Sequence, residues 1–327
     1  MAGGNASSQV ELLIYGPRKP VVEAGFTDDY VLHKVEQLAD LERLPPVAFE
    51  TIRGIAVTGL VPASSAVLAR FPKLEIVSSF GVGYDHVDSA WARDHGVIVT
   101  NTPDVLTEEV ADTALGLLIA TLREFVKADK FVRSGLWATQ DYPLSAGSLR
   151  DRTVGMVGMG RIGQAIGRRL DAAKVPVVYH SRNPAAGVAY KHYPDLIEMA
   201  KAVDTLVVII PGGAATAKLI NAEVMAALGP RGVIINVARG SVIDEPALIA
   251  ALSSGAIQAA GLDVFAQEPK VPEELRTLPN VVLLPHIGSA SVVTRNAMDQ
   301  LVVDNLAAWF AGQPPLTPIA ETPVKGR

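Results

Sequence analysis

The sequence of 327 residues contains no cysteine. Disulfide bonds, thiolate nucleophiles and cysteine-ligated metal sites are therefore excluded, and the absence is typical of a reducing compartment. The first residues, MAGGNASSQ, also lack the basic start and the apolar segment of a secretory signal. We therefore expect a cytoplasmic protein.

Long hydrophobic runs and an excess of positive charge are missing as well. The most apolar segment, VADTALGLLIATL, contains Asp112 and is followed by Arg123 and Glu124, so it is shorter than a membrane-spanning helix requires. The formal net charge of −5 provides no overall positive field to attract nucleic acid or anionic membranes. We expect neither of them as a partner.

The six histidines show no spacing typical of metal ligands, such as an i, i+4 pair or a compact cluster with acidic residues. They are His33, His86, His95, His180, His192 and His286. The sequence therefore predicts no metal site.

Short aliphatic runs alternate with amphipathic segments along nearly the whole chain, which is the pattern of βαβ units with parallel sheets. In the first half we expect helices near residues 28–38, 64–71 and 88–95, and strands at residues 10–15, 54–59, 74–80 and 96–101. In the second half we expect six strands, at residues 153–158, 175–180, 204–210, 232–237, 257–264 and 281–285. Six is the number that a Rossmann sheet requires. A chain of this length exceeds one hydrophobic core, so the expected fold class is α/β with two doubly wound domains.

Two helical segments suggest how the domains are connected. Residues 107–124 lie between the two series of strands, and the amphipathic residues 291–311 are expected to return to the first domain. The predicted domains are residues 1–101 with 288–327, and residues 102–287. The proline-rich residues 313–327 are expected to form a surface tail.

The motif GMGRIG follows a predicted strand and opens a predicted helix. Gly158 permits a tight turn, Gly160 lets the backbone approach a pyrophosphate, and Gly163 allows the helix to pack closely on the strand. Arg161 and Ile162 then begin the helix at the anion-binding end. The alternative is a glycine-rich turn that binds nothing, but the strand, the helix and the further strands favour a dinucleotide site.

The end of the next predicted strand carries Ser181 and Arg182 where NAD-binding proteins often carry an acid. An acid repels a ribose 2′-phosphate, whereas a guanidinium pairs with it through two hydrogen bonds and a serine hydroxyl donates to it. The sequence therefore predicts NADPH in preference to NADH. The alternative is that Arg182 is only a solvated loop charge.

Three charged or titratable residues lie at the ends of successive predicted strands: Arg239, Glu268 and His286. Arginine binds carboxylates, histidine transfers a proton near neutral pH, and a carboxylate beside histidine fixes its tautomer. Each residue taken alone has a structural alternative as a loop or strand-end residue. Together, behind a dinucleotide motif, they indicate reduction of a 2-oxo acid by hydride transfer.

These motifs resemble those of the D-isomer-specific 2-hydroxyacid dehydrogenases, and the resemblance covers nearly the whole chain. The segments that carry it are FGVGYDHVD, NTPDVLTEEVADTALGLLIA, VGMGRIG, PGGAAT, NVARGSVIDEPAL, GLDVFAQEP and PHIGSAS. Within the family, the chain is similar to the NADPH-dependent glyoxylate/hydroxypyruvate reductase branch, which extends to phenylpyruvate-type acids. The resemblance implies a flavodoxin-like substrate domain and a Rossmann cofactor domain with a cleft between them.

The resemblance also implies roles for single residues. Arg239 would bind the substrate carboxylate, His286 would protonate the developing alkoxide, and Glu268 would support His286. The N–H groups of Val82 and Gly83 would complete the carboxylate site. The implied cofactor residues, besides the glycine loop and Ser181 with Arg182, are Thr107, Pro211, Thr216, Val237, Ala238, Asp263, His286 and Gly288. Asp263 would hold the nicotinamide carboxamide, although it has an alternative role as a turn cap, as the threonines have as helix caps.

The family forms homodimers through the cofactor domain. By resemblance, residues 125–149 would form a dimer arm, and Trp137 would contribute to the partner's substrate pocket. A lone tryptophan is otherwise more often a packing anchor.

Other functions stay open at this point. A phosphoglycerate-type or other D-2-hydroxyacid dehydrogenase using NAD is the nearest catalytic alternative. Formate dehydrogenases share the architecture, but Glu268 before Pro269 favours 2-oxo acid chemistry. A corepressor-like protein that binds the dinucleotide as a signal is the distant alternative, and turnover would distinguish it from an enzyme.

Overall fold

The computed structural model describes residues 9–59 and 61–324, so nearly all of the N-terminal MAGGNASSQ segment lies outside the described residues. The chain divides into two compact units, residues 1–106 with 291–327 and residues 107–290. Each unit is described by itself.

The first unit contains a five-stranded parallel sheet in the order β2-β1-β3-β4-β5. This is the flavodoxin-like order of a doubly wound sheet. The strands are β1 (Val10–Tyr15), β2 (Tyr30–Val35), β3 (Ile52–Val57), β4 (Ile76–Ser79) and β5 (Ile98–Thr100). Its helices are α1 (Pro20–Ala24), α2 (Pro46–Thr51), α3 (Ser65–Leu68), α4 (Ser89–Asp94) and α12 (Val292–Phe310), with a 3₁₀ turn η1 (Leu38–Arg43). The strands β3 and β4 are almost entirely buried, as expected for a parallel sheet that is covered on both faces.

The prediction of a helix near residues 28–38 is wrong, because Tyr30–Val35 form the edge strand β2 beside β1. Its β-branched residues favour an extended backbone, and Pro20 starts the preceding helix α1 much earlier in the chain. Helix α12, which follows the second unit in sequence, packs against α1, β3 and β4.

The C-terminal residues 313–324 are not the loose surface tail that their composition suggests, and residues 325–327 lie outside the described residues. The side chain of Ile319 is 5% exposed, and its N–H donates to the carbonyl of Val99 over 2.9 Å. The Thr322 hydroxyl accepts a hydrogen bond from the N–H of Val99, and the Thr317 hydroxyl donates to the carbonyl of Asn101. Prolines here prevent a helix but do not prevent docking along the edge strand β5.

The second unit contains a seven-stranded parallel sheet in the order β12-β11-β10-β9-β6-β7-β8. The strands are β6 (Val154–Val157), β7 (Val177–His180), β8 (Lys191–Tyr193), β9 (Thr205–Val208), β10 (Val233–Asn236), β11 (Ala259–Leu262) and β12 (Val281–Leu283). This is the Rossmann order with one strand more than predicted, since the short polar segment Lys191–Tyr193 pairs with β7. The expectation of two doubly wound α/β domains is confirmed for each unit.

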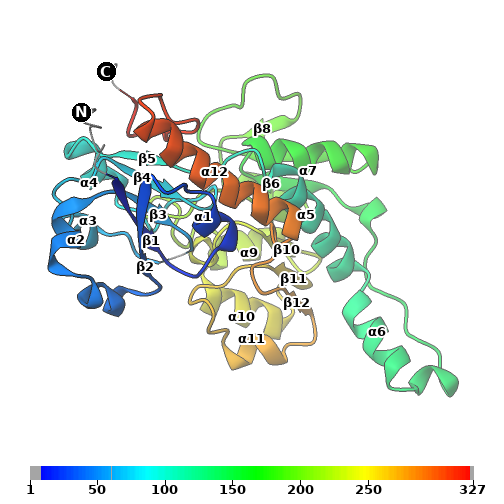
Figure 1. Ribbon diagram of the computed structural model, residues 1–327. Coiled ribbons are helices and arrows are strands. Elements are labelled where there is room, and N and C mark those ends of the chain that lie inside the picture. Colours follow the sequence, from blue (N-terminus) through cyan, green and yellow to red (C-terminus); the bar gives the residue numbers. More distant parts are fainter. Residues whose placement is uncertain (1–8, 60, 325–327) are drawn as a thin grey trace, which may run out of the picture. The chain divides into compact units, whose positions relative to one another are not determined.

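Helices cover both faces of the second sheet (Figure 1). They are α5 (Thr107–Leu122), α7 (Arg161–Ala172), α8 (Leu196–Ala202), α9 (Ala222–Leu228), α10 (Glu245–Ser254) and α11 (Glu273–Thr277). The unit also contains α6 (Phe125–Arg133), which extends away from the sheet, and the 3₁₀ turns η2 (Leu136–Ala138), η3 (Leu149–Asp151) and η4 (Gly240–Val242). A Cβ on Gly261 of β11 would contact Leu117 and Thr121 of α5, whereas its neighbours Ala260 and Leu262 belong to the core with α8, α9 and α10. Successive strand residues point to opposite faces, so the two sets of helices lie on opposite sides.

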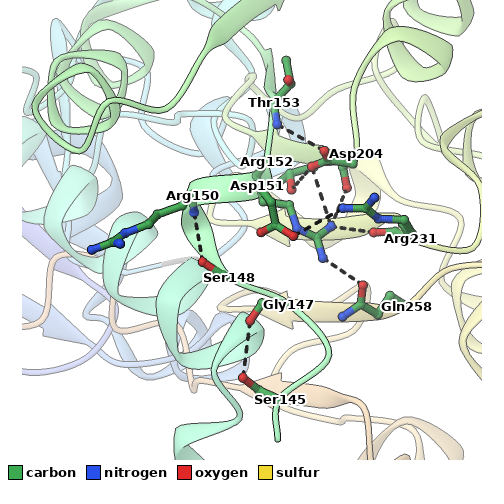
Figure 2. Close-up of polar contacts among 11 residues, drawn as sticks. Ser145, Gly147, Ser148, Arg150, Asp151, Arg152, Thr153, Asp204, Arg231 and Gln258 are labelled. Atoms are coloured by element: carbon green, nitrogen blue, oxygen red, sulfur yellow. Dashed lines mark hydrogen bonds and ion pairs between the residues drawn. The ribbon is translucent and has the colours of Figure 1, made fainter.

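Arg152 connects the amino ends of several strands of this sheet through hydrogen bonds (Figure 2). Its side chain is 1% exposed and donates to the carbonyls of Asp204 and Arg231 and to the side-chain oxygen of Gln258. A Cβ on Gly147 would lie 2.8 Å from the guanidinium. Arg152 therefore also fixes the point where residues 125–149 rejoin the sheet.

Among the residues that the structure describes, none of the helices combines the length and the apolar character of a membrane span.

Candidate functional site

The GMGRIG loop connects β6 to α7 at the carboxyl edge of the seven-stranded sheet. Gly158 has φ +106, and a Cβ there would lie 2.5 Å from the carbonyl oxygen of Ile209. A Cβ on Gly163 would lie 2.6 Å from the carbonyl oxygen of Gly158, which explains the close contact of helix and strand. Gly160, by contrast, would direct a Cβ into open space with no atom within 4 Å. The N-terminus of the 12-residue helix α7 therefore has room for a phosphate group in front of it.

Ser181 and Arg182 follow β7, the strand beside the glycine loop. The N–H of Gly158 donates to the carbonyl of His180 over 2.9 Å, which places the loop and the end of β7 side by side. The Ser181 hydroxyl donates to the carbonyl of Asn183, and Arg182 is exposed. The segment of residues 181–183, SRN, contains no carboxylate, so the positive charge of Arg182 suits an additional phosphate group.

Glu268 and His286 form a hydrogen-bonded pair in which Nδ1 of the histidine lies 2.6 Å from Oε2 of the glutamate. The other carboxylate oxygen, Oε1, accepts the N–H of Phe265 over 3.0 Å. Burial by itself would raise the pKa of Glu268, but the hydrogen bond and charge of His286, the N–H of Phe265 and the charge of Arg239 together bring that pKa below its usual value. Glu268 is therefore an ionised partner that holds Nδ1 and leaves Nε2 of His286 for chemistry.

Arg239 lies in the loop after β10, half-buried, and its charge acts on Glu268. Asn236 shapes this loop, because its amide accepts the N–H of Ala238 and donates to the carbonyl of Arg239, both over 3.0 Å. A Cβ on Gly240 would lie 1.8 Å from the carbonyl carbon of Phe265. The Arg239 loop and the Glu268 loop therefore fit together only with glycine at position 240.

Asn236 and Gly240 were not predicted as site residues. The motif NVARGS contains both, but only the three-dimensional contact shows that they set the position of Arg239 relative to Glu268.

Asp263, at the end of β11, is 1% exposed and caps the loop that follows β12. Its two carboxylate oxygens accept the N–H groups of Ile287 and Gly288 over 2.7 and 2.8 Å, and its carbonyl accepts the N–H of His286. Burial raises the pKa of Asp263, and these N–H groups oppose that rise. These contacts fix the backbone of His286, which has φ +55. They correspond to the capping role, while contact with a nicotinamide carboxamide stays a prediction.

Of the remaining predicted cofactor residues, Pro211, Thr216, Val237, Ala238 and Gly288 lie in loops that follow strands of this sheet, at the same carboxyl edge. The Thr216 hydroxyl donates to the carbonyl of Pro211 over 2.7 Å, so it shapes the loop after β9. Val237 and Ala238 are buried directly after β10, and Thr107 is the first residue of α5.

Val82 and Gly83 belong to the first unit, in the loop after β4. Gly81 begins the loop with φ +118, and its N–H donates to the hydroxyl of Thr102. The carbonyl of Val82 accepts from the amide of Asn101 over 2.8 Å. Within residues 9–59 and 61–324, no hydrogen-bond partner is seen for the N–H groups of Val82 and Gly83. Two adjacent donors of this kind suit an anion.

In the described part of the chain, no three histidine, aspartate or glutamate side chains are grouped as metal ligands would be.

The chain is similar to known proteins in sequence and in structure. Residues 115–288 match the model of the NAD binding domain of the D-isomer specific 2-hydroxyacid dehydrogenases. The sequence is 48% identical over 269 residues to a glyoxylate/hydroxypyruvate reductase of Arabidopsis thaliana, covering 82% of this chain and 86% of that protein. It is also 48% identical over 270 residues to the hydroxyphenylpyruvate reductase of Plectranthus scutellarioides, covering 83% and 86%. The crystal structure of an NADPH-dependent glyoxylate/hydroxypyruvate reductase from Sinorhizobium meliloti, in complex with NADP and malonate, is similar with a TM-score of 0.93 and 52% identity, covering 98% of this chain and 99% of that one.

Proposed function

Because the chain belongs to the D-isomer specific 2-hydroxyacid dehydrogenase family, we propose that it reduces small 2-oxo acids of the glyoxylate and hydroxypyruvate type to D-2-hydroxy acids with NADPH. The observation that carries the proposal is the 2.6 Å pair of His286 and Glu268, on the same sheet edge as the glycine loop. The names of the relatives from Arabidopsis and Sinorhizobium support the substrate class.

The two units are proposed to have different tasks. Residues 102–287 would bind the cofactor, and residues 1–101 with 288–327 would bind substrate. The compact units have their limits a few residues away, at 106/107 and 290/291. The family match to residues 115–288 as an NAD binding domain supports the first assignment.

The residues of the second unit fit a dinucleotide. The open space at Gly160 and the free end of α7 suit a pyrophosphate, with Arg161 and Ile162 at the start of the helix. The other residues proposed to hold the cofactor are Thr107, Gly158, Gly163, Ser181, Arg182, Pro211, Thr216, Val237, Ala238, Asp263, His286 and Gly288. When bound, the reduced nicotinamide supplies a hydride to carbon 2 of the substrate.

A preference for NADPH is proposed from Ser181 and Arg182. A guanidinium and a hydroxyl interact favourably with a ribose 2′-phosphate, whereas an acid at this place would repel it. The complex of the Sinorhizobium relative with NADP supports this preference.

The proposed catalytic residues each act at a stated atom. The guanidinium of Arg239 and the N–H groups of Val82 and Gly83 bind the substrate carboxylate, and Arg239 also polarises the 2-oxo group. Nε2 of His286 gives its proton to the oxygen on carbon 2 as that atom becomes an alkoxide. Glu268 holds the imidazole through Nδ1 and stabilises its protonated form.

A homodimer through the second unit is also proposed. Helix α6 has no buried residue, and apolar side chains on residues 125–149 are exposed, among them Phe125, Leu136 and Trp137 at 52%, 44% and 65%. In Figure 1 α6 extends away from the sheet of its own unit, so these side chains are available to a second copy. A monomeric mass in solution at micromolar concentration would contradict the dimer. The cytoplasmic location likewise stays a prediction.

The substitution His286→Ala tests the function directly. It should lower kcat for hydroxypyruvate reduction at least 100-fold, because the proton donor is lost. The Kd for NADPH should change less than threefold, because His286 is only one of many residues proposed to hold the cofactor. The measurements are NADPH oxidation at 340 nm and NADPH fluorescence titration, with chiral analysis of the product. An L-product, or equal turnover by the variant, would contradict the proposal, and cofactor binding without any turnover would favour the dinucleotide-sensing alternative.

A further inference from the structure

Two cationic side chains lie against the ring of Phe80 at the carboxyl edge of the first unit's sheet, and one of them pairs with a carboxylate. Nζ of Lys19, in the loop after β1, lies 3.9 Å from the centroid of the Phe80 ring. The guanidinium of Arg295 on α12 lies 5.2 Å from the same centroid. Asp299, one turn further along α12, places Oδ1 3.7 Å from Nζ of Lys19. Carboxyl edges of parallel sheets are where α/β proteins bind ligands.

The ammonium group of Lys19 is held in place but is not saturated. Its side chain is 19% exposed, and its distance of 3.7 Å to Asp299 is that of an ion pair longer than a hydrogen bond. Burial lowers the pKa of Lys19, and the carboxylate of Asp299 opposes that change. An ammonium has three donors, and contact with an aromatic face uses none of them as a conventional hydrogen bond. The group is therefore available to an oxygen acceptor.

Phe80 joins this cluster to the proposed carboxylate loop. It is 6% exposed, and the next residue, Gly81, starts the loop whose Val82 and Gly83 N–H groups are proposed to hold the substrate carboxylate. Thr102 and Asn101 fix this loop through the N–H of Gly81 and the carbonyl of Val82. The ring that contacts the ammonium group therefore belongs to the residue directly before the loop that is proposed to bind the carboxylate.

We propose that Lys19 is a specificity-determining residue whose ammonium donates a hydrogen bond to an oxygen on carbon 3 of the 2-oxo acid. The inference rests on the proposed function. It selects substrates such as hydroxypyruvate, which carries a 3-hydroxyl, over glyoxylate, which has no carbon 3. Asp299 and the ring of Phe80 are positioning groups, because they hold Lys19 where this oxygen would lie.

The test compares the two substrates in Lys19→Met, which keeps an apolar stem and removes the charge. The ratio of kcat/KM for hydroxypyruvate to that for glyoxylate should fall about tenfold or more, as expected for the loss of a charged donor. Lys34→Met is the matched control, because Lys34 lies on β2 in the same unit and pairs with Glu23 at the surface. Its ratio should stay within twofold of the wild-type value. If Lys19→Met folds poorly because the buried carboxylate of Asp299 has lost its cation, the double variant Lys19→Met/Asp299→Asn takes its place. The double variant should show the same fall in the ratio of kcat/KM.

A binding measurement separates this inference from the proposed function. With NADPH present, the products D-glycerate and glycolate form complexes that cannot react, and their affinities are measured by fluorescence titration. The wild type should bind D-glycerate more tightly than glycolate, and Lys19→Met should lose this preference. This result is expected even if the physiological substrate is a different 2-oxo acid. The role of Lys19 would be overturned if Lys19→Met lowered kcat/KM equally for hydroxypyruvate and glyoxylate. It would also be overturned if the variant changed neither the ratio of kcat/KM nor the preference for D-glycerate over glycolate. A wild type without turnover that still shows the Lys19-dependent preference would instead overturn the proposed function alone.

Discussion

At the scale of single residues, the proposed chemistry depends on a carboxylate that stays charged although it is half-buried. Glu268 does so because His286, the N–H of Phe265 and the charge of Arg239 all stabilise its ionised form against the effect of burial. Its pKa in the folded chain lies below the ordinary value of about 4.3. Folding therefore favours the ionised form, and this contribution to stability is present at neutral pH and is lost only as the pH falls through the lowered pKa.

The substitution Glu268→Gln removes this charge but keeps an amide oxygen as an acceptor for Nδ1–H. We expect kcat/KM to fall roughly 10- to 100-fold at pH 7, since a neutral amide stabilises a protonated imidazole less than a carboxylate does. For the same reason, the pH at which activity declines on the alkaline side should move downward by about one unit. The measurement is kcat/KM between pH 5 and 10 for both proteins. Superimposable profiles would show that Glu268 has only a structural role.

The positions of Arg239, Glu268 and His286 after successive strands could be predicted because the aliphatic strands before them are visible in the sequence. Their catalytic roles stay a proposal. The roles of Asn236 and Gly240 could not be predicted. The side chain of Asn236 shapes its own loop through bonds to Ala238 and Arg239, and Gly240 meets Phe265, which lies 25 residues further along the chain. Asp263 was predicted as a cofactor residue, and the structure adds that both of its oxygens hold the backbone after His286.

At the scale of elements, the loops that carry Arg239 and Glu268 are held together by close backbone contact between Gly240 and Phe265. The buried strands and the long helices α5 and α12 were predicted, because the strands are short aliphatic runs and the two helices are long amphipathic or apolar segments. The strands β2 and β8 were not, because short, polar edge strands such as Lys191–Tyr193 are stabilised by pairing with a neighbour and carry little hydrophobic signal.

The substitution Gly240→Ala tests the contact between the loops after β10 and β11. The added Cβ would overlap the backbone of Phe265, so the loop that carries Glu268 must move. We expect the free energy of unfolding in urea to fall by about 1 to 3 kcal/mol and the turnover to fall more than tenfold.

The matched control is Gly116→Ala, because Gly116 lies within α5 and a Cβ there would meet no atom within 4 Å. It should be neutral or stabilising by up to about 1 kcal/mol. If both variants unfold at the same urea concentration as the wild type, the loops do not depend on Gly240.

At the scale of the whole molecule, each unit is a complete doubly wound sheet, and the sequence predicted both. The C-terminal residues 313–324 were the main error, because their composition suggests a tail whereas Ile319 and Thr322 dock on β5. The proline-rich composition predicts that this segment forms no helix or strand. It cannot predict that the segment docks on β5 through a few hydrogen bonds and the side chain of Ile319. Because the net charge of −5 would repel anionic ligands, the proposed binding of cofactor and substrate requires local cations, and Arg182, Arg239 and Lys19 are proposed to supply them.

The central claim is that this molecule transfers a hydride from NADPH to a small 2-oxo acid. The most direct measurement is kcat/KM for NADPH and for NADH, with hydroxypyruvate saturating, in the wild type and in Arg182→Glu. We predict that the wild type prefers NADPH by at least tenfold and that the variant loses or reverses this preference, because the glutamate repels the 2′-phosphate. A wild type that prefers NADH, or that oxidises neither cofactor with any 2-oxo acid, would contradict the claim of NADPH-dependent hydride transfer.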